Sequence, residues 1–195
     1  MIQPQLQFPP ETLLAAQGLC TQGHIGMRAA LFDVDGVLTD GRLWIGETGE
    51  LFKPFHALDG HGLKLLRQAQ IEPVIITGRD SAAVRRRVAD LGIVHAHYGV
   101  HDKQAVAHTL LSQMHWDWGD IAVMGDDWPD LPIMIQAGFA CAPPNAHSEV
   151  KVRAHYVTQA AGGHGGVREF CDLLLMASGQ YARMLQGHLT TLDGN

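Results

Sequence analysis

The stretch Leu31-Phe32-Asp33-Val34-Asp35-Gly36-Val37-Leu38-Thr39 decides the fold of this chain. An apolar run typical of a buried strand ends in two aspartates separated by one residue, and a glycine follows. In α/β sheets, ligands bind beyond the carboxyl ends of the strands, so Asp33 and Asp35 are expected at a functional edge. Two close carboxylates repel each other, and a bound cation would relieve that repulsion. The alternative is a structural turn, because Asp also favours strand ends.

The composition is typical of one globular domain. Apolar residues make up 46% of the 195 residues and charged residues 17%, with a formal net charge of −6. This acidic balance argues against a nucleic-acid partner. No apolar run approaches the ~20 residues that span a bilayer, which argues against a membrane partner. Cys20, Cys141 and Cys171 are few and far apart, so reduced thiols and a cytoplasmic location are expected.

Strand and helix patterns alternate along the chain. Strands are expected at 28–34, 73–77, 93–98, 121–125, 139–142 and 156–158, and helices at 9–22, 60–70, 80–91, 102–115, 129–137 and 167–188. This alternation predicts an α/β fold with a doubly wound, mostly parallel, Rossmann-like sheet. We expect residues 1–27 to form an N-terminal extension and residues 28–195 a single domain.

Between the first two strands, Arg42–Ile45 and Glu50–Lys53 flank Gly46-Glu47-Thr48-Gly49, which predicts a β-hairpin. Its apolar side chains Trp44, Leu51 and Phe52 are expected on an intersubunit surface rather than in local packing.

Polar groups follow three further expected strands. Thr77-Gly78-Arg79 ends the second, Lys103 opens the helix after the third, and Gly125-Asp126-Asp127 ends the fourth. These groups should meet at one edge of the sheet. Carboxylates, a hydroxyl and an ammonium are the groups that phosphoryl transfer with Mg²⁺ uses. We expect Asp127 to orient Lys103 or Asp126, and Asp130 to start the next helix.

In their order, these four segments resemble the haloacid dehalogenase superfamily of aspartate-dependent phosphotransferases, from the first strand onward. The resemblance implies that Asp33 is the nucleophile that becomes an aspartyl phosphate, with Asp35 as general acid and then general base. It implies that Asp33, the backbone carbonyl of Asp35 and Asp126 hold Mg²⁺. It further implies that Thr77 and Lys103 hold the transferred phosphoryl group.

A nearer resemblance is to the 3-deoxy-D-manno-octulosonate 8-phosphate phosphatases, which are cytoplasmic, Mg²⁺-dependent homotetramers of lipopolysaccharide synthesis without a cap domain. It is carried by the hairpin, the strand-end motifs, His56-Ala57-Leu58-Asp59-Gly60 and residues 161–169. It implies a phosphorylated eight-carbon sugar acid as substrate and active sites covered by neighbouring subunits. The implied substrate pocket consists of Asp35, His56, Ala57, Leu58, Asp59, Gly60, Lys64, Gly78, Arg79, Arg87, Lys103 and Asp127.

Two segments depart from that family's pattern. The family usually has Val-Arg-Asp-Gly where this chain has Ala57-Leu58-Asp59-Gly60, and Gly-Gly-Arg-Gly-Ala where it has His164 and Gly166. The alternative is therefore a phosphatase of nine-carbon nonulosonate 9-phosphates, although Arg79 stands where those enzymes often carry an acidic residue. The Gly-rich run 162–166 either is a flexible joint or reaches into an active site.

Two other classes of protein fit the sequence less well. A signalling receiver domain accepts phosphate on an aspartate after a mid-chain strand, and none ends the strand expected at 93–98. A non-catalytic oligomeric scaffold would require a broken acidic site, whereas every expected position is occupied.

Overall fold

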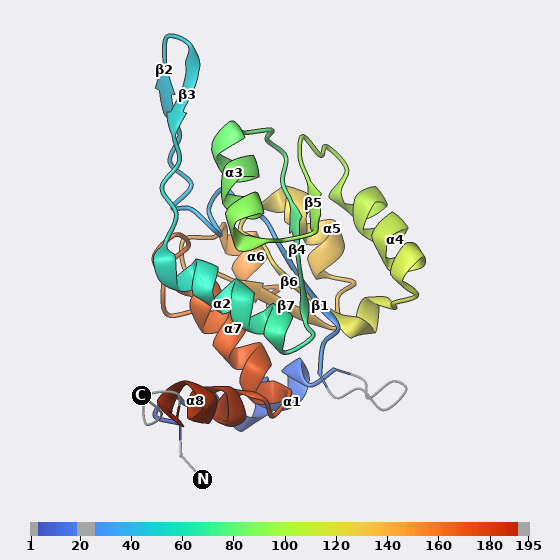
Figure 1. Cartoon of the computed structure of the whole chain (residues 1–195). Helices are drawn as coiled ribbons and strands as arrows, with labels where there is room; N and C mark the ends of the chain where they lie inside the picture. Colours follow the sequence, from blue (N-terminus) through green and yellow to red (C-terminus); the bar gives the residue numbers. More distant parts are fainter. Residues whose placement is uncertain (1–3, 19–25, 191–195) are drawn as a thin grey trace.

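A computed structural model of the chain describes residues 4–18 and 26–190 (Figure 1). Within them, six parallel strands form one sheet in the order β5-β4-β1-β6-β7-β8. These strands are β1 (Ala29–Phe32), β4 (Glu72–Ile76), β5 (His95–His97), β6 (Ile121–Met124), β7 (Phe139–Ala142) and β8 (Tyr156–Val157). The predicted doubly wound parallel sheet is confirmed.

Strand β1 lies at the centre of the sheet. All four of its residues are buried, because helices cover both faces of a doubly wound sheet. Leu31 lies opposite Val74 of β4 on one side and Val123 of β6 on the other. The three strands therefore end side by side, and the N–H of Asp33 still donates to the Met124 carbonyl at 3.1 Å.

Two layers of helices bury the two faces (Figure 1). Alternate strand residues point to opposite sides, so Phe32 faces one layer and Leu31 the other. The first layer holds α1 (Pro10–Ala16), α2 (Ala57–Gln68), α3 (Ala82–Leu91) and α7 (Gly166–Ala177). The second holds α4 (Lys103–Met114), α5 (Leu131–Met134) and the short α6 (Ser148–Lys151), which the sequence pattern did not predict.

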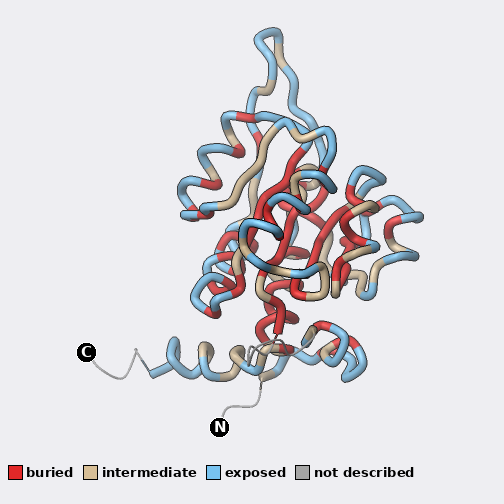
Figure 2. The backbone as a smooth tube through the Cα atoms, turned by 90° about the vertical axis from the view of Figure 1, so that its right-hand side faces the viewer, coloured by how far each residue is buried: buried red, intermediate tan, exposed pale blue. Residues whose placement is uncertain are grey.

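The predicted hairpin is confirmed and projects from the body of the molecule (Figures 1 and 2). It pairs β2 (Trp44–Gly46) with β3 (Gly49–Phe52) in antiparallel fashion. The rings of Trp44 and Phe52 stack with their centroids 5.1 Å apart. Both rings stay exposed, as do Ile45 and Leu51, so local stacking does not bury the apolar side chains of the hairpin.

The prediction of a single helix at 167–188 is wrong, because this segment forms two helices, α7 and α8 (Tyr181–Thr190). Gly179 has a φ of 72°, which favours glycine and ends the first helix. The N–H of Gly179 donates to the Met176 carbonyl, and that of Gln180 to the Leu175 carbonyl, which is the hydrogen-bond pattern of a Schellman cap.

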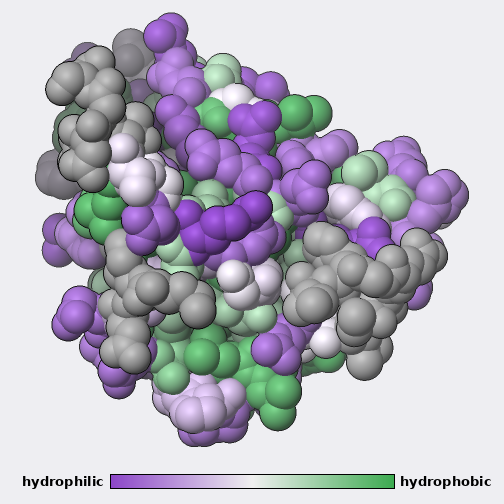
Figure 3. Space-filling model, turned by 60° about the horizontal axis from the view of Figure 1, so that its bottom comes forward, coloured by the Kyte–Doolittle hydropathy of each residue, from purple (hydrophilic) through white to green (hydrophobic). Residues whose placement is uncertain are grey.

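The N-terminal helix is shorter than predicted. It ends at Ala16, and residues 19–22 of the predicted range lie outside the described residues. Phe8 packs edge-on against Tyr156, and Ala16 is buried near α7. Figure 3 views the end of the molecule where α1 and α8 lie and shows polar and apolar residues interspersed. No helix in the described part of the chain has the length and hydrophobicity to cross a membrane.

Other helix boundaries follow their local signals. The Ser81 hydroxyl accepts the N–H of Val84 at the start of α3, and Asp102 accepts that of Ala105 at the start of α4. Helix α2 begins three residues before the predicted Gly60, at Ala57. The helix predicted at 129–137 is instead a 3₁₀ turn, Trp128–Asp130, followed by the short α5.

Candidate active site

The carboxyl ends of β1, β4 and β6 open into a pocket of about 510 Å³. It brings together the strand-end segments that the sequence predicted would meet. Its walls are formed by Asp33, Asp35, Gly41, Thr77, Gly78, Arg79, Val100, His101, Lys103, Asp126, Asp127 and Pro129. All the predicted catalytic and metal-binding residues are in this set.

A cluster of three carboxyl groups, two of them in the pocket wall, could hold a cation. Single oxygens of Asp33, Asp126 and Asp130 lie within 4.8 Å of one another. Burial, with the Asp130 charge, raises the pKa of Asp33 to about 6 against the opposing effect of Lys103. Burial, with the Asp33 charge, raises the pKa of Asp126 to about 8. Both shifts show that burial and mutual repulsion disfavour the ionised carboxylates, which a bound cation would stabilise.

The surroundings of Asp126 fit a magnesium ion. Its Oδ1 is buried and has no hydrogen-bond partner among the described residues. Its Oδ2 lies against Gly36, where a Cβ would come within 2.0 Å and where φ is 91°. A glycine is therefore required beside this carboxylate. The all-oxygen donor set is the one that Mg²⁺ prefers.

Lys103 is held between two carboxylates. Its Nζ lies 3.0 Å from Asp33 Oδ1 and 2.6 Å from Asp130 Oδ1, and its side chain is buried. Burial alone would lower the pKa of Lys103, but the charges of Asp130 and Asp33 outweigh it and raise the pKa. The ammonium therefore stays charged beside Asp33, where it can stabilise a transferred phosphoryl group.

Asp127 was predicted to orient Lys103 or Asp126, but Asp130 makes both of these contacts: its Oδ1 pairs with the Lys103 ammonium and its Oδ2 accepts the Asp126 N–H. The second oxygen of Asp130, Oδ2, accepts the backbone N–H groups of Asp126 at 3.1 Å and Asp127 at 3.3 Å. Asp127 is exposed at the pocket. The spacing of Asp127 and Asp130 is that of a capping box, which is a sequence signal for the contact between these two residues but not for the pairing of Asp130 with Lys103.

Changing Asp130 to Asn is expected to lower kcat by about 10–100-fold, as is typical for residues that orient a site's ligands. The amide cannot balance the Lys103 charge, so the ammonium loses its anchor opposite Asp33. Steady-state rates of phosphate release measure the effect. Asp90→Asn, at an exposed carboxylate on α3, is the control and should be unchanged. An unaffected Asp130→Asn enzyme would contradict the role assigned to Asp130.

Two buried threonines hold backbone segments at or beside the pocket. The Thr39 hydroxyl donates to the Val34 carbonyl at 3.4 Å and accepts the N–H groups of Gly36 and Gly41. It therefore fixes the loop that carries Asp35. The Thr77 hydroxyl accepts the N–H of Arg79 at 3.4 Å and lies at the pocket wall.

The Gly-rich run contacts the catalytic loop of its own chain. Asn145 donates from Nδ2 to the Gly36 carbonyl at 2.9 Å and accepts the Gly162 N–H on Oδ1 at 2.7 Å. The Gly163 N–H donates to the Val37 carbonyl. Residues 162 and 163 thus do not act as a free joint. No sequence motif marked Asn145, which joins the two segments.

Gly162→Ala is expected to destabilise the fold by about 1–3 kcal/mol, the usual cost of overpacking. A Cβ at this position would lie 1.8 Å from the Gly36 carbonyl oxygen, so the two backbones must separate. Urea unfolding measures the loss. Gly187→Ala is the matched control, because a Cβ there meets nothing within 4 Å. Equal stability of the two variants would show that the close approach carries no cost.

Seven predicted substrate residues lie outside the pocket. Asp59 is buried and accepts the Arg168 N–H at the start of α7, at 2.8 Å. Arg87 donates to the His56 carbonyl at 3.3 Å. Lys64 lines a separate surface pocket on α2. The single chain does not bring these residues to Asp33, and their substrate roles stay a prediction: His56, Ala57, Leu58, Asp59, Gly60, Lys64 and Arg87.

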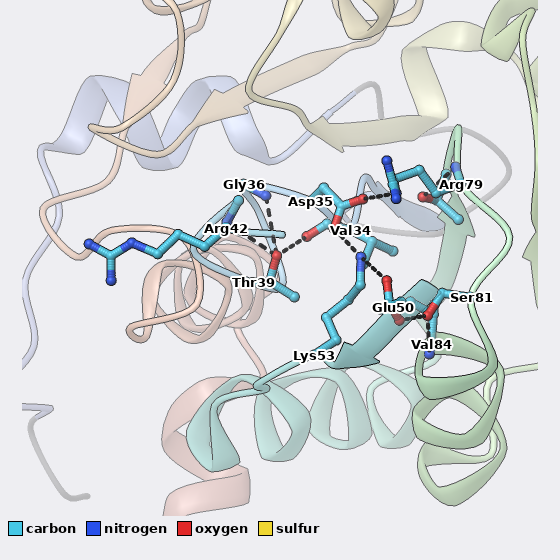
Figure 4. Close-up of polar contacts among 12 residues, drawn as sticks. Val34, Asp35, Gly36, Thr39, Arg42, Glu50, Lys53, Arg79, Ser81 and Val84 are labelled. Atoms are coloured by element: carbon cyan, nitrogen blue, oxygen red, sulfur yellow. Dashed lines mark hydrogen bonds and ion pairs between the residues drawn. The ribbon is translucent and has the colours of Figure 1, made fainter. Parts of the chain in front are cut away.

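Lys53 is a site residue that sequence reasoning missed. Its ammonium pairs with Asp35 and lies 3.3 Å from Glu50 Oε2 (Figure 4). Burial acts to raise the pKa of Glu50, but the Ser81 hydroxyl and Lys53 outweigh it and lower the pKa. The hairpin position of Lys53 gave no chemical signal in the sequence.

A parallel sheet whose central strand delivers two aspartates beside a threonine, a lysine and a third aspartate defines a haloacid dehalogenase-like hydrolase. Residues 96–170 match the sequence model of the haloacid dehalogenase-like hydrolase family. A 3-deoxy-D-manno-octulosonate 8-phosphate phosphatase of Yersinia pestis is 41% identical over 156 residues, which cover 80% of this chain and 83% of that protein. The chain belongs to the 3-deoxy-D-manno-octulosonate 8-phosphate phosphatase family.

Solved structures agree with this assignment. A probable YrbI family phosphatase from Pseudomonas syringae superimposes with a TM-score of 0.86 at 39% identity, covering 96% of this chain and 100% of that one. The Moraxella catarrhalis 3-deoxy-D-manno-octulosonate 8-phosphate phosphatase, solved with magnesium, phosphate and the sugar acid, gives a TM-score of 0.84 at 34% identity. That match covers 91% of this chain and 98% of the other.

Proposed function

We propose that this protein is a Mg²⁺-dependent phosphatase that hydrolyses 3-deoxy-D-manno-octulosonate 8-phosphate in lipopolysaccharide biosynthesis. The observation that carries the proposal is the meeting of Asp33, Asp35, Thr77, Lys103 and Asp126 in one pocket. The family assignment supports the choice of substrate, because curated relatives and the magnesium-bound structure carry that enzyme's name.

In this proposal the reaction has two steps. A carboxylate oxygen of Asp33 bonds to phosphorus while the P–O bond to the sugar breaks, and Asp35 gives its proton to the departing sugar oxygen. Asp35 then takes a proton from water as the water oxygen bonds to phosphorus and the aspartyl phosphate breaks. Lys103, 3.0 Å from Asp33 Oδ1, and the Thr77 hydroxyl hold the phosphoryl oxygens throughout.

Magnesium would be held by Asp33, the backbone carbonyl of Asp35 and Asp126. When bound, it offsets the negative charge of the carboxylates and the phosphoryl group. The raised pKa values of Asp33 and Asp126 and the unpartnered Oδ1 of Asp126 support this role.

Arg79 is the pocket residue best suited to select a sugar acid. Its side chain is 47% exposed at the pocket wall and lies 3.8 Å from Asp35 Oδ2. A guanidinium can bind a carboxylate through two parallel hydrogen bonds, which fits the acid group of the sugar.

The function is tested by steady-state rates on two substrates. We expect kcat/KM for the eight-carbon 8-phosphate to exceed that for a nonulosonate 9-phosphate, with phosphate release dependent on Mg²⁺. A clear preference for the nine-carbon substrate would replace the proposed one. An absence of turnover on every sugar-acid phosphate would favour a non-catalytic relative.

We also propose a cytoplasmic homotetramer in which neighbouring subunits complete each site. The exposed apolar side chains of the hairpin, which include Trp44, Leu51 and Phe52, support self-association. Cys141 and Cys171 are buried and free, which fits a reducing compartment. Light scattering should give the mass of four chains, and Trp44→Ser with Phe52→Ser should lower it.

A further inference from the structure

A buried cation that the two steps above do not use contacts Asp35, which lines the pocket. Lys53 follows β3 of the hairpin, and its side chain is 2% exposed. Its ammonium donates to Asp35 Oδ1 and lies 3.3 Å from Glu50 Oε2. A buried charge is retained only where its partners compensate the loss of water. Lys53 therefore has a fixed position, determined by these two carboxylates.

The hairpin partner of Lys53 is itself held in place. The other oxygen of Glu50, Oε1, accepts a hydrogen bond from the Ser81 hydroxyl, which also caps α3. Figure 4 shows the Lys53 amine between Glu50 and Asp35, with Arg79 on the far side of the Asp35 carboxyl group. A continuous chain of contacts thus runs from α3 through the hairpin to Asp35.

The two oxygens of Asp35 are in different situations. Oδ1 contacts the buried Lys53, whereas Oδ2 lies 3.8 Å from Arg79, whose side chain is 47% exposed. The Lys53 ammonium occupies a lone pair of Oδ1 and disfavours a proton on that oxygen. Oδ2, which faces Arg79 at the pocket wall, is therefore the oxygen better suited to exchange a proton with a group in the pocket.

We infer that Lys53 is a positioning residue that fixes the Asp35 carboxyl group so that Oδ2 transfers the proton in both steps. This inference rests on the proposed phosphatase function. A general acid or base must lie within hydrogen-bond reach of the proton it moves. Without Lys53, rotation of the carboxyl group would take Oδ2 out of that geometry. The hairpin would then contribute to catalysis through Glu50 and Lys53 as well as to the surface.

The test separates the two steps with p-nitrophenyl phosphate. Its leaving group departs without a proton donor, so forming the aspartyl phosphate does not need Asp35, whereas its hydrolysis does. In Lys53→Met we expect the hydrolysis rate constant to fall by about 10–100-fold and the formation rate constant by less than about threefold. Rapid-quench kinetics should then show a burst of one p-nitrophenol per active site, followed by slow turnover.

Three further variants control the experiment. Arg42→Met removes an exposed cation from the same hairpin, and its guanidinium points away from Asp35 (Figure 4), so both constants should be unchanged. Glu50→Gln loosens Lys53 from the hairpin side and should slow the same step to a smaller degree, even if Lys53→Met fails to fold. In the Asp35→Asn background, Lys53→Met should add no further loss.

The outcomes distinguish the inference from the function on which it rests. If the wild-type enzyme turns over neither p-nitrophenyl phosphate nor any sugar-acid phosphate, the proposed function fails and the inference fails with it. If the wild-type enzyme turns over but both constants fall together in the Lys53 and Glu50 variants, the residues have a general structural role. If neither constant falls, Lys53 does not position Asp35. Either of the last two results would overturn the inference.

Discussion

Replacing Asp33 with asparagine is expected to lower turnover by about 10⁴-fold or more, because an amide does not supply the carboxylate nucleophile. Asp33 directly follows the central strand, and its Oδ1 lies 3.0 Å from the Lys103 ammonium. Among the described residues, the other carboxylate paired with Lys103 is Asp130, which lies far from the end of β1 in the sequence. Phosphate release measures the loss. Mass spectrometry of acid-quenched enzyme should show a phosphate adduct on the wild type and none on the variant.

The same variant should keep its fold and gain stability in the absence of metal. The pKa of Asp33 is raised to about 6, so its ionised form destabilises the folded state at pH 7, and a neutral side chain removes that penalty. Chemical denaturation at pH 7 with a chelator present checks this. Near-full activity of Asp33→Asn would contradict the covalent mechanism, and an unfolded variant would contradict the electrostatic argument.

These shifts also set the pH dependence of the metal-free protein. The folded-state pKa values, about 6 for Asp33 and about 8 for Asp126, exceed the ordinary aspartate value of 3.8. The folded state therefore binds more protons than the unfolded state in this range. The stabilisation from these two groups is complete below about pH 4 and is lost as the pH rises through 6 and 8.

Removing Mg²⁺ is the second change with a large expected effect. Chelation should reduce phosphate release to background, and added Mg²⁺ should restore it, because two carboxylates and the phosphoryl group would otherwise share one pocket without compensation. Thermal unfolding should shift upward with added Mg²⁺, since an ion that binds only the folded state stabilises it. Full activity in chelator would contradict the proposed cofactor.

Magnesium binding should also release protons. Without metal, Asp126 has a pKa of about 8 and is mostly protonated at pH 7, whereas a metal ligand must be ionised. Because binding displaces this one proton, the affinity for Mg²⁺ should weaken by up to about tenfold for each pH unit below 8. Titration calorimetry in two buffers of different ionisation enthalpy measures the released protons. The Asp126→Asn variant should release no proton on binding Mg²⁺. An equal heat of binding in both buffers for the wild-type protein would contradict the predicted proton release.

The sequence by itself determined the sheet and the residues at its edge. Asp33, Thr77 and Asp126 each follow an apolar run directly, and parallel strands in register place their ends together. The same logic placed Lys103 at the start of the next helix. These inferences succeeded because each depends only on a residue's position relative to its own strand or helix, which local patterning specifies.

Only the tertiary structure decided which groups hold that edge in place. Lys53 meets Asp35 across 18 positions, Lys103 meets Asp130 across 27, and Asn145 meets Gly36 across 109. Periodicity and turn chemistry describe neighbours along the chain, so they carry no information on such pairs. These contacts arise when packing two helical layers onto one sheet buries charges and amides that must then find partners.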